Sequence, residues 1–191
     1  IGAHIGCHSI GYSSIQHDAQ IYSFEPQKQL YHLLEKNCIN KNNIRVFNQA
    51  VGAFNGTCTI PDTIEQEDNK HFSYEDEKSY NYGGIGIGEG SNEVEMVTID
   101  SLKLEGCDFI KIDVEGFEYF VLKGAEETIK KYKPVIFYEE NGKVLTPYMK
   151  KINHCENKTD KELNCKDYLE SLGYNKFENK LKDERSTNIK K

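Results

Sequence analysis

Two groups of residues in this sequence have types and spacings suited to chemistry. The first is a glycine-containing loop, Gly2-x-x-x-Gly6, together with Glu25, which closes an apolar run 23 positions after Gly2. Glycine lets the backbone approach a ligand closely and adopt dihedral angles that other residues avoid. In doubly wound α/β proteins, a carboxylate at the end of the second strand binds ribose hydroxyls. The loop and Glu25 therefore predict a site for an adenosine-containing ligand.

The spacing of the glycines distinguishes between two kinds of cofactor. A dinucleotide such as NAD needs the pattern Gly-x-Gly-x-x-Gly around its pyrophosphate, and this loop lacks it. The helix that follows the loop offers free N–H groups and a positive dipole end, which suit a carboxylate such as that of methionine. The loop therefore favours S-adenosylmethionine over NAD, with His4 contacting the ligand through its backbone.

The second group lies in the run Ile110-Lys111-Ile112-Asp113-Val114-Glu115-Gly116. A central parallel strand is normally apolar on both faces, yet Lys111 and Asp113 interrupt this run and point to the same face. Burying such charges is costly unless they pair or serve a ligand. Asp113 falls at the carboxyl end of the strand, where open α/β sheets bind ligands. We interpret it as a general base for a hydroxyl, and a purely structural Lys111–Asp113 ion pair is the alternative.

Further carboxylates gather near the predicted strand ends, namely Glu115, Glu118, Glu139 and Glu140. We count Glu115 with Lys111 and Asp113 as a catalytic candidate. Several carboxylates at one rim can hold Mg²⁺, but a solvated helix face would account for Glu118 equally well, so no metal is predicted. His4 and His8 lack the glutamate of a His-Glu-x-x-His motif, and a zinc site is not expected either.

The elements that must position these residues alternate along the chain. Four apolar runs have strand character, at 21–24, 44–47, 109–114 and 134–138. Pro26 opens a helical pattern that continues to Cys38, and apolar positions from Phe117 to Ile129 form a single helical stripe. This alternation predicts parallel βαβ units in a mostly parallel, doubly wound α/β sheet.

Residues 55–100 interrupt the alternation. Short strands are expected at 57–60 and 94–98, separated by an acidic, tyrosine-bearing loop from Asp62 to Tyr82 and a glycine-rich stretch at 83–88. A loop this long is usually a binding loop or is disordered, and we place substrate recognition there, with disorder as the alternative. A helix ending at Gly173 and a short strand follow, and 178–191 is expected to be a tail or an edge element.

Length and composition limit the functional classes. With 191 residues, the chain suits a single domain, 1–191, and its net charge of −7 with only two arginines disfavours nucleic-acid binding. No run approaches the roughly 20 apolar residues of a membrane span. The six cysteines contain no Cys-x-x-Cys pair, which favours reduced cysteines and a cytoplasmic location.

Taken together, these motifs resemble the FkbM family of S-adenosylmethionine-dependent methyltransferases. The matching stretches run in order from Ile1 to about Asn141, and the Lys-Ile-Asp-Val-Glu-Gly stretch at 111–116 is distinctive for that family. The resemblance implies a Rossmann-like class I methyltransferase fold whose first strand is truncated, with most of it upstream of Ile1. His4 stands where the family often has asparagine, and the closing antiparallel hairpin is not evident near Lys191.

The resemblance also implies roles for individual residues. Glycine and small residues of the opening loop would line the methionine end of the cofactor, Glu25 the ribose, and Gln49-Ala50 the adenine, with Asp113 at the reacting centre. The full set of expected cofactor contacts is Ile1, Gly2, Ala3, His4, Gly6, Glu25, Pro26, Gln49 and Ala50. From the residues alone, Gln49 would be a polar loop residue.

The function expected from the sequence is methyl transfer from S-adenosylmethionine to a hydroxyl of a sugar, glycan or natural product. One alternative is a domain that binds the adenosine cofactor without turnover. An NAD-dependent oxidoreductase and a nucleic-acid methyltransferase are weaker alternatives, because the dinucleotide loop and a basic surface are both missing from the sequence.

Overall fold

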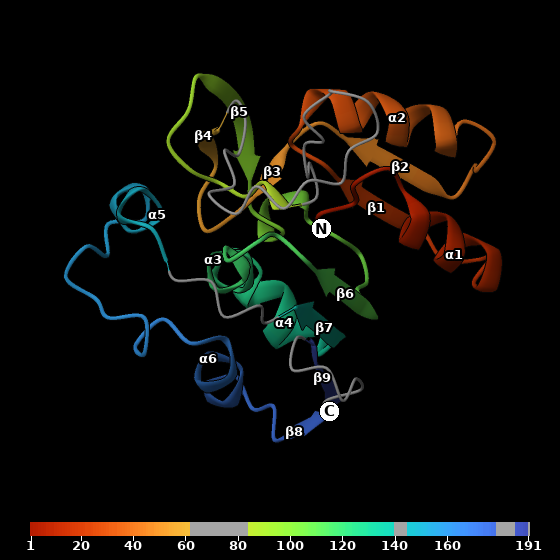
Figure 1. Ribbon diagram of the computed structural model, residues 1–191. Coiled ribbons are helices and arrows are strands. Elements are labelled where there is room, and N and C mark those ends of the chain that lie inside the picture. Colours follow the sequence, from red (N-terminus) through yellow and green to blue (C-terminus); the bar gives the residue numbers. More distant parts are fainter. Residues whose placement is uncertain (62–83, 140–144, 179–185, 191) are drawn as a thin grey trace.

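The computed structural model of the chain describes residues 1–61, 84–139, 145–178 and 186–190. Helices and strands alternate at its start as the hydrophobic pattern predicts, and α1 packs on β1 while α2 packs on β2 (Figure 1). The apolar stripe of α2, with Leu30, Leu34 and Cys38, is buried. The bounds of these elements are α1 (Cys7–Ile15), β1 (Ile21–Phe24), α2 (Lys28–Cys38) and β2 (Ile44–Phe47).

Hydrogen bonding groups the strands into three sheets. β1 pairs with β2 in parallel, and β6 pairs with β7 in parallel. β5 lies between a parallel β3 and an antiparallel β4. The strands expected at 21–24, 44–47, 57–60, 94–98, 109–114 and 134–138 are confirmed, with ends that differ by at most two residues. The remaining bounds are β3 (Ala50–Val51), β4 (Gly56–Ile60), β5 (Asn92–Val97), β6 (Phe109–Ile112) and β7 (Val135–Glu139).

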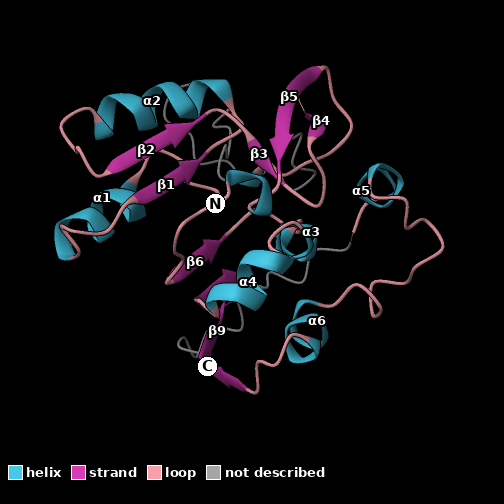
Figure 2. Cartoon of the chain, turned by 180° about the vertical axis from the view of Figure 1, so that it is seen from behind, coloured by secondary structure: helices cyan, strands magenta, loops and turns pink. Residues whose placement is uncertain are grey.

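The first three residues lie between the sheet that contains β1 and the sheet that contains β6. The backbone nitrogen of Ile1 donates to the Lys111 carbonyl (2.7 Å), and the Ile1 carbonyl accepts from Asp113 N (3.3 Å). On the other side, Ala3 N donates to the Phe24 carbonyl (2.9 Å). Both views show the chain start between β1 and β6 (Figures 1 and 2). The opening loop therefore begins where the carboxyl ends of β1 and β6 meet. The strand pairings do not join the three sheets into one continuous sheet, so the doubly wound sheet stays a prediction.

An antiparallel hairpin completes the sheet that contains β6 and β7. β8 (Lys176–Glu178) and β9 (Ser186–Lys190) pair with each other, and β9 also pairs antiparallel with β7. Within 178–191, where we expected a tail or an edge element, β9 is thus an interior strand of the order β6-β7-β9-β8. Its Ser-Thr-Asn-Ile-Lys sequence is mostly polar, so hydrophobicity alone did not reveal the hairpin.

The helical stripe expected from Phe117 to Ile129 forms two helices rather than one. α3 (Glu118–Lys123) ends at Gly124, and α4 (Glu126–Tyr132) begins two residues later. The apolar residues of the stripe are nevertheless all buried, so the prediction of a core-facing surface was right and the prediction of a single helix was wrong. The buried positions are Phe117, Phe120, Val121, Ala125 and Ile129.

The close packing of Gly124, which lies between the two helices, against Gly52 depends on the absence of a side chain at Gly124. A Cβ atom there would lie 1.8 Å from the Gly52 carbonyl oxygen. Gly124→Ala should therefore lower the free energy of unfolding by about 1–3 kcal/mol, as overpacking of a tight interior does. Chemical denaturation would measure this, with Gly106→Ala as the control because a Cβ at Gly106 meets no atom within 4 Å. Equal stability of both variants would contradict the prediction.

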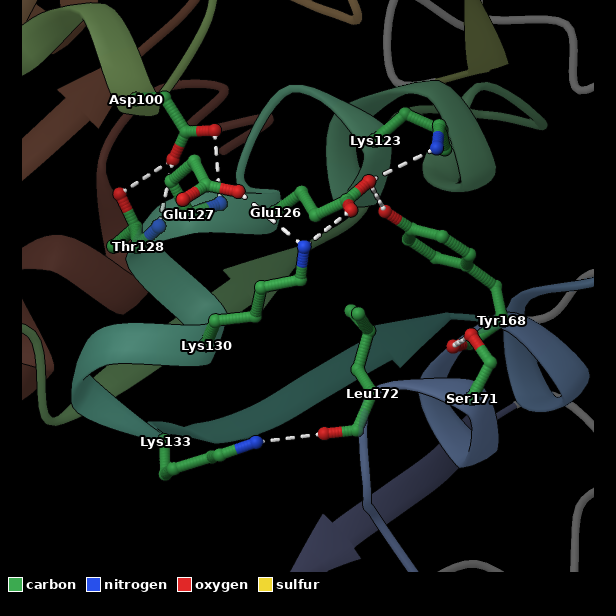
Figure 3. A network of polar contacts seen from close by, with 10 residues as sticks. All are labelled: Asp100, Lys123, Glu126, Glu127, Thr128, Lys130, Lys133, Tyr168, Ser171 and Leu172. Carbon is green, nitrogen blue, oxygen red and sulfur yellow. Dashed lines mark hydrogen bonds and ion pairs between the residues drawn. The ribbon is translucent and has the colours of Figure 1, made fainter.

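A network of hydrogen bonds and ion pairs joins α6 (Cys165–Ser171) to α4 (Figure 3). The Glu126 carboxylate accepts hydrogen bonds from Lys130 Nζ (2.7 Å), Lys123 Nζ (3.0 Å) and Tyr168 Oη (2.5 Å). The bonds from Lys130, Tyr168 and Lys123 lower the pKa of Glu126 to about 2. The elements outside the three sheets that complete the described chain are η2 (Asp100–Leu102), α5 (Pro147–Ile152) and α6 (Cys165–Ser171). In residues 1–61, 84–139, 145–178 and 186–190, no helix is long and apolar enough to span a membrane.

Candidate active site

A cavity of about 330 Å³ lies where the opening loop meets the carboxyl ends of β1 and β6. That volume is within the range of small-molecule sites. It brings together both groups of residues identified in the sequence, from Gly2 and Glu25 to Lys111 and Asp113. The predicted site residues that line it are Ile1, Gly2, Ala3, His4, Glu25, Pro26, Gln49, Ala50, Lys111, Asp113 and Glu115.

Gly6 is the exception among the predicted contacts, because it does not line the cavity. It is buried at the N-terminal cap of α1 with a φ of 95°. A Cβ at this position would lie 2.8 Å from a methyl carbon of Leu34 in α2. Gly6 thus allows α1 to start close to α2, which gives it a packing role at this position.

The opening loop turns through left-handed backbone conformations at Gly2 (φ 70°) and His4 (φ 51°). A Cβ on Gly2 would lie 1.7 Å from the Asp113 carbonyl oxygen. Only glycine therefore fits where the opening loop contacts the backbone of Asp113. His4 has an exposed side chain, and its backbone N–H is the part that faces the site. Asparagine and histidine tolerate left-handed conformations better than most residues do.

Glu25 is buried, with 3% of its surface exposed. Its Oε2 accepts a hydrogen bond from His4 N (2.8 Å), and its Oε1 accepts one from Gln27 N (3.0 Å). Burial raises the pKa of Glu25, and the two backbone hydrogen bonds offset part of that increase. A carboxylate has about four acceptor positions, so this fixed side chain keeps acceptor capacity for ligand hydroxyls.

The segment after β2 supports the Glu25 loop and reaches the cavity wall. The Asn48 side-chain amide donates to the carbonyls of Glu25 (2.9 Å) and Pro26 (3.0 Å), which fixes the turn after β1. Gln49 donates from Nε2 to Glu95 Oε2 (2.9 Å), so its amide nitrogen is engaged by the protein. The structure places Gln49 and Ala50 on the wall where an adenine ring was expected.

Lys111 and Asp113 lie on one face, as the strand alternation predicts, and they form an ion pair there. Lys111 Nζ lies 2.7 Å from Asp113 Oδ2, and it also donates to the Gly2 carbonyl (3.3 Å). The Lys111 side chain is 9% exposed and the Asp113 side chain 31%. Burial acts to raise the pKa of Asp113, but the charge and hydrogen bond of Lys111 outweigh it and hold the pKa below its usual value. Asp113 is therefore an ionised carboxylate within reach of the cavity.

The turn after Asp113 is held by the carboxylate of Glu118, for which the sequence left a solvated helix face as one alternative. Glu118 is 6% exposed, and its Oε1 accepts from Gly116 N (3.1 Å) and Val114 N (3.3 Å). The turn itself contains Glu115 in a left-handed conformation (φ 57°). Strained backbone of this kind is maintained by its surroundings, and Glu118 supplies that support to the wall formed by Glu115.

Several lining residues were noted in the sequence but were not among the predicted catalytic residues or cofactor contacts. Glu139 at the end of β7, the His8 side chain on α1 and the segment 85–87 all border the cavity. The glycine-rich run 83–88 in the sequence was a signal for a close approach of two backbone segments. The structure shows such an approach, because a Cβ on Gly86 would lie 2.9 Å from the Glu115 carbonyl oxygen. The acidic loop expected to recognise the substrate, with Tyr74, Tyr80 and Tyr82, lies outside the described residues.

Two further findings concern metal binding and the charge of His8. Across the part of the chain that the structure describes, no three His, Cys, Asp or Glu side chains are grouped so as to hold a metal ion. Burial and the nearby Lys111 charge lower the pKa of His8, which keeps its imidazole neutral at neutral pH. The cavity therefore presents carboxylates, one lysine and a neutral histidine.

Comparison with known proteins identifies the family and a similar fold. A family model described as the methyltransferase FkbM domain matches residues 1–176. No curated protein matches the chain. A similar solved structure is the crystal structure of Methyltransferase FkbM from Methylobacillus flagellatus KT, with 17% sequence identity and a TM-score of 0.61. The alignment covers 99% of this chain and 42% of that one, so this chain spans less than half of that protein. At this identity, the likeness shows a shared methyltransferase fold.

Proposed function

Because the chain belongs to the FkbM methyltransferase domain family, we propose that it transfers a methyl group from S-adenosylmethionine to a hydroxyl of a sugar, glycan or natural product. The observation that carries the proposal is the convergence of Glu25 and Asp113 on one cavity from opposite sides of the opening loop. A ribose-binding carboxylate and a proton acceptor are the two groups that such a reaction requires of the protein.

The residues present fit the methyl donor. Glu25 is fixed by backbone N–H groups and can accept ribose hydroxyls. The backbone of Gly2 and Ala3 borders the same cavity and suits the amino-acid end, and Gln49 with Ala50 suits the adenine. When bound, S-adenosylmethionine supplies an activated methyl group on a positively charged sulfur. Glu25, Asp113, Glu115 and Glu139 line the cavity, and their negative charge favours a cationic donor.

The protein contributes mainly by positioning. The cavity walls hold the acceptor oxygen in line with the methyl group, which reduces the entropic part of the barrier. Asp113 accepts a hydrogen bond from the acceptor hydroxyl and draws its proton as the oxygen becomes a nucleophile. Lys111 keeps Asp113 ionised and oriented through the 2.7 Å contact. The Ile1 carbonyl and the Glu118 carboxylate accept hydrogen bonds from Asp113 N and Val114 N and so hold the backbone at and after Asp113.

The same observations weigh on the alternatives. A domain that only binds the cofactor would not need an ionised carboxylate and its lysine at the cavity wall, so this arrangement favours turnover. A dehydrogenase remains disfavoured by the opening loop. The described pairings and the family together support a doubly wound sheet. None of the six cysteines, all of which lie in the described residues, forms a disulfide, which supports the proposal of a reducing, cytoplasmic setting.

Binding of S-adenosylhomocysteine to the full-length protein tests the donor directly. Calorimetry should show one site per chain. Glu25→Gln should weaken binding about 10- to 100-fold, since it removes a charged acceptor worth roughly 1.5–3 kcal/mol. Glu35→Gln is the matched control, because Glu35 is exposed on α2 and bonds only Tyr31 in the contacts described. Failure of the wild-type protein to bind would refute the proposed function.

A further inference from the structure

Glu139 lies beside Asp113 on the neighbouring strand of the sheet that contains β6 and β7. β6 and β7 run in parallel with Ile112 opposite Tyr138, so Asp113 and Glu139 follow side by side at the carboxyl ends of their strands. Both side chains border the same cavity. Two carboxylates side by side in one cavity do not easily both carry a charge, so the pair is suited to holding a proton.

We propose that Asp113 and Glu139 act as a pair that takes up the proton of the acceptor hydroxyl, with Glu139 as the final proton acceptor. The proposal rests on the proposed methyl transfer and adds to it a catalytic residue on a different strand. It also explains why the last residue of β7 is a glutamate whose side chain faces the cavity.

The charges around the pair decide which member keeps the proton. Lys111 lies 2.7 Å from Asp113 and lowers its pKa, so a proton on Asp113 is not retained. Burial, the hydrogen bond to Asp113 and the charges of Asp113 and Glu115 raise the pKa of Glu139 to about 7, against a smaller opposing effect of Lys111. His8 on α1 borders the same cavity. On the β9 side, the backbone of Glu139 is paired with that of Ser186.

The transfer balances when it starts from the state in which the bound cationic donor has displaced the proton of Glu139, so that both carboxyl groups are ionised. The acceptor oxygen forms a bond to the methyl carbon as the carbon–sulfur bond breaks, with its electron pair left on sulfur. The proton leaves the oxygen through Asp113 and ends on Glu139, which becomes a neutral carboxylic acid. One positive charge on the donor and one negative charge on Glu139 are thereby cancelled, and solvent later removes the proton.

Proton release on ligand binding tests the pair without an acceptor. S-adenosylmethionine and S-adenosylhomocysteine differ by the methyl group and its positive charge. A cation in the cavity lowers the pKa of Glu139, so at pH 7 the charged ligand should release up to about half a proton more than the neutral one. Calorimetry of the full-length protein with each ligand, in two buffers of different ionisation enthalpy, measures this difference.

Glu139→Gln should abolish the difference in proton release while still binding both ligands. Glu105→Gln is the matched control, because Glu105 is exposed and lies outside the cavity, and it should keep the wild-type difference. Equal release for the two ligands in the wild type, or a difference that survives in Glu139→Gln, would overturn the pair and leave the methyl donor intact. Absence of binding by either ligand would refute the donor itself, and the pair with it.

Discussion

Asp113→Asn is expected to lower the rate of methyl transfer by about 10²- to 10⁴-fold, the usual contribution of a general base. Asparagine keeps the size of the side chain and can still accept a hydrogen bond from Lys111, but it cannot take up a proton. The affinity for S-adenosylhomocysteine should change by less than about threefold, because Glu25 and the opening loop are untouched. Release of S-adenosylhomocysteine during turnover with a panel of hydroxyl acceptors measures the rate, and calorimetry measures the affinity.

A second variant separates this role from that of a structural ion pair. Asp113→Asn leaves the cation of Lys111, which is 9% exposed, without its counter-charge, so some loss of stability is expected as well. Combining it with Lys111→Met removes the uncompensated charge and should restore stability. If the pair serves catalysis, the double variant folds well but stays inactive. If turnover returned with stability, Asp113 would be structural and its role as base would be excluded.

The part of the site that could be predicted follows from short-range rules. Strand alternation placed Lys111 and Asp113 on one face, and the structure brings them to 2.7 Å. Glu25 was predicted at the end of its strand because an apolar run stops there, and it is buried at the cavity wall. Such inferences need only the period of a strand and the direction of parallel pairing, which the sequence carries directly.

The roles that were not predicted depend on contacts between distant segments. Glu139 belongs to the site only because β7 aligns beside β6, and its partner Asp113 is 26 positions earlier. Glu118 has the spacing of an exposed helical residue, yet two backbone N–H groups of the preceding turn draw it inside. Gly6 and Gly124 each make room for a neighbouring segment, Gly6 for Leu34 of α2 and Gly124 for the Gly52 backbone. No periodic pattern encodes these approaches.

Gly2→Ala is expected to weaken binding of S-adenosylhomocysteine by more than about 100-fold and to destabilise the fold by roughly 2–5 kcal/mol. The substitution adds one carbon where the backbone has a φ of 70°, and that carbon would lie 1.7 Å from the Asp113 carbonyl oxygen. Both the opening loop and the turn carrying Asp113 must then move, and the Ile1 and Ala3 hydrogen bonds between β1 and β6 would be strained. Calorimetric titration and thermal unfolding measure the two effects.

The matched control is Gly11→Ala, an identical change in the helix that follows the loop. Gly11 is exposed on α1, and a Cβ there meets no atom within 4 Å. Because alanine favours a helix interior over glycine, this variant should gain about 0.5–1 kcal/mol of stability and bind the ligand as the wild type does. The contrast attributes the loss in Gly2→Ala to the contact with Asp113, since general intolerance of the segment would affect both variants. Wild-type affinity in Gly2→Ala would show that the loop and the Asp113 turn can separate without loss of the cofactor site, so the two groups would act independently.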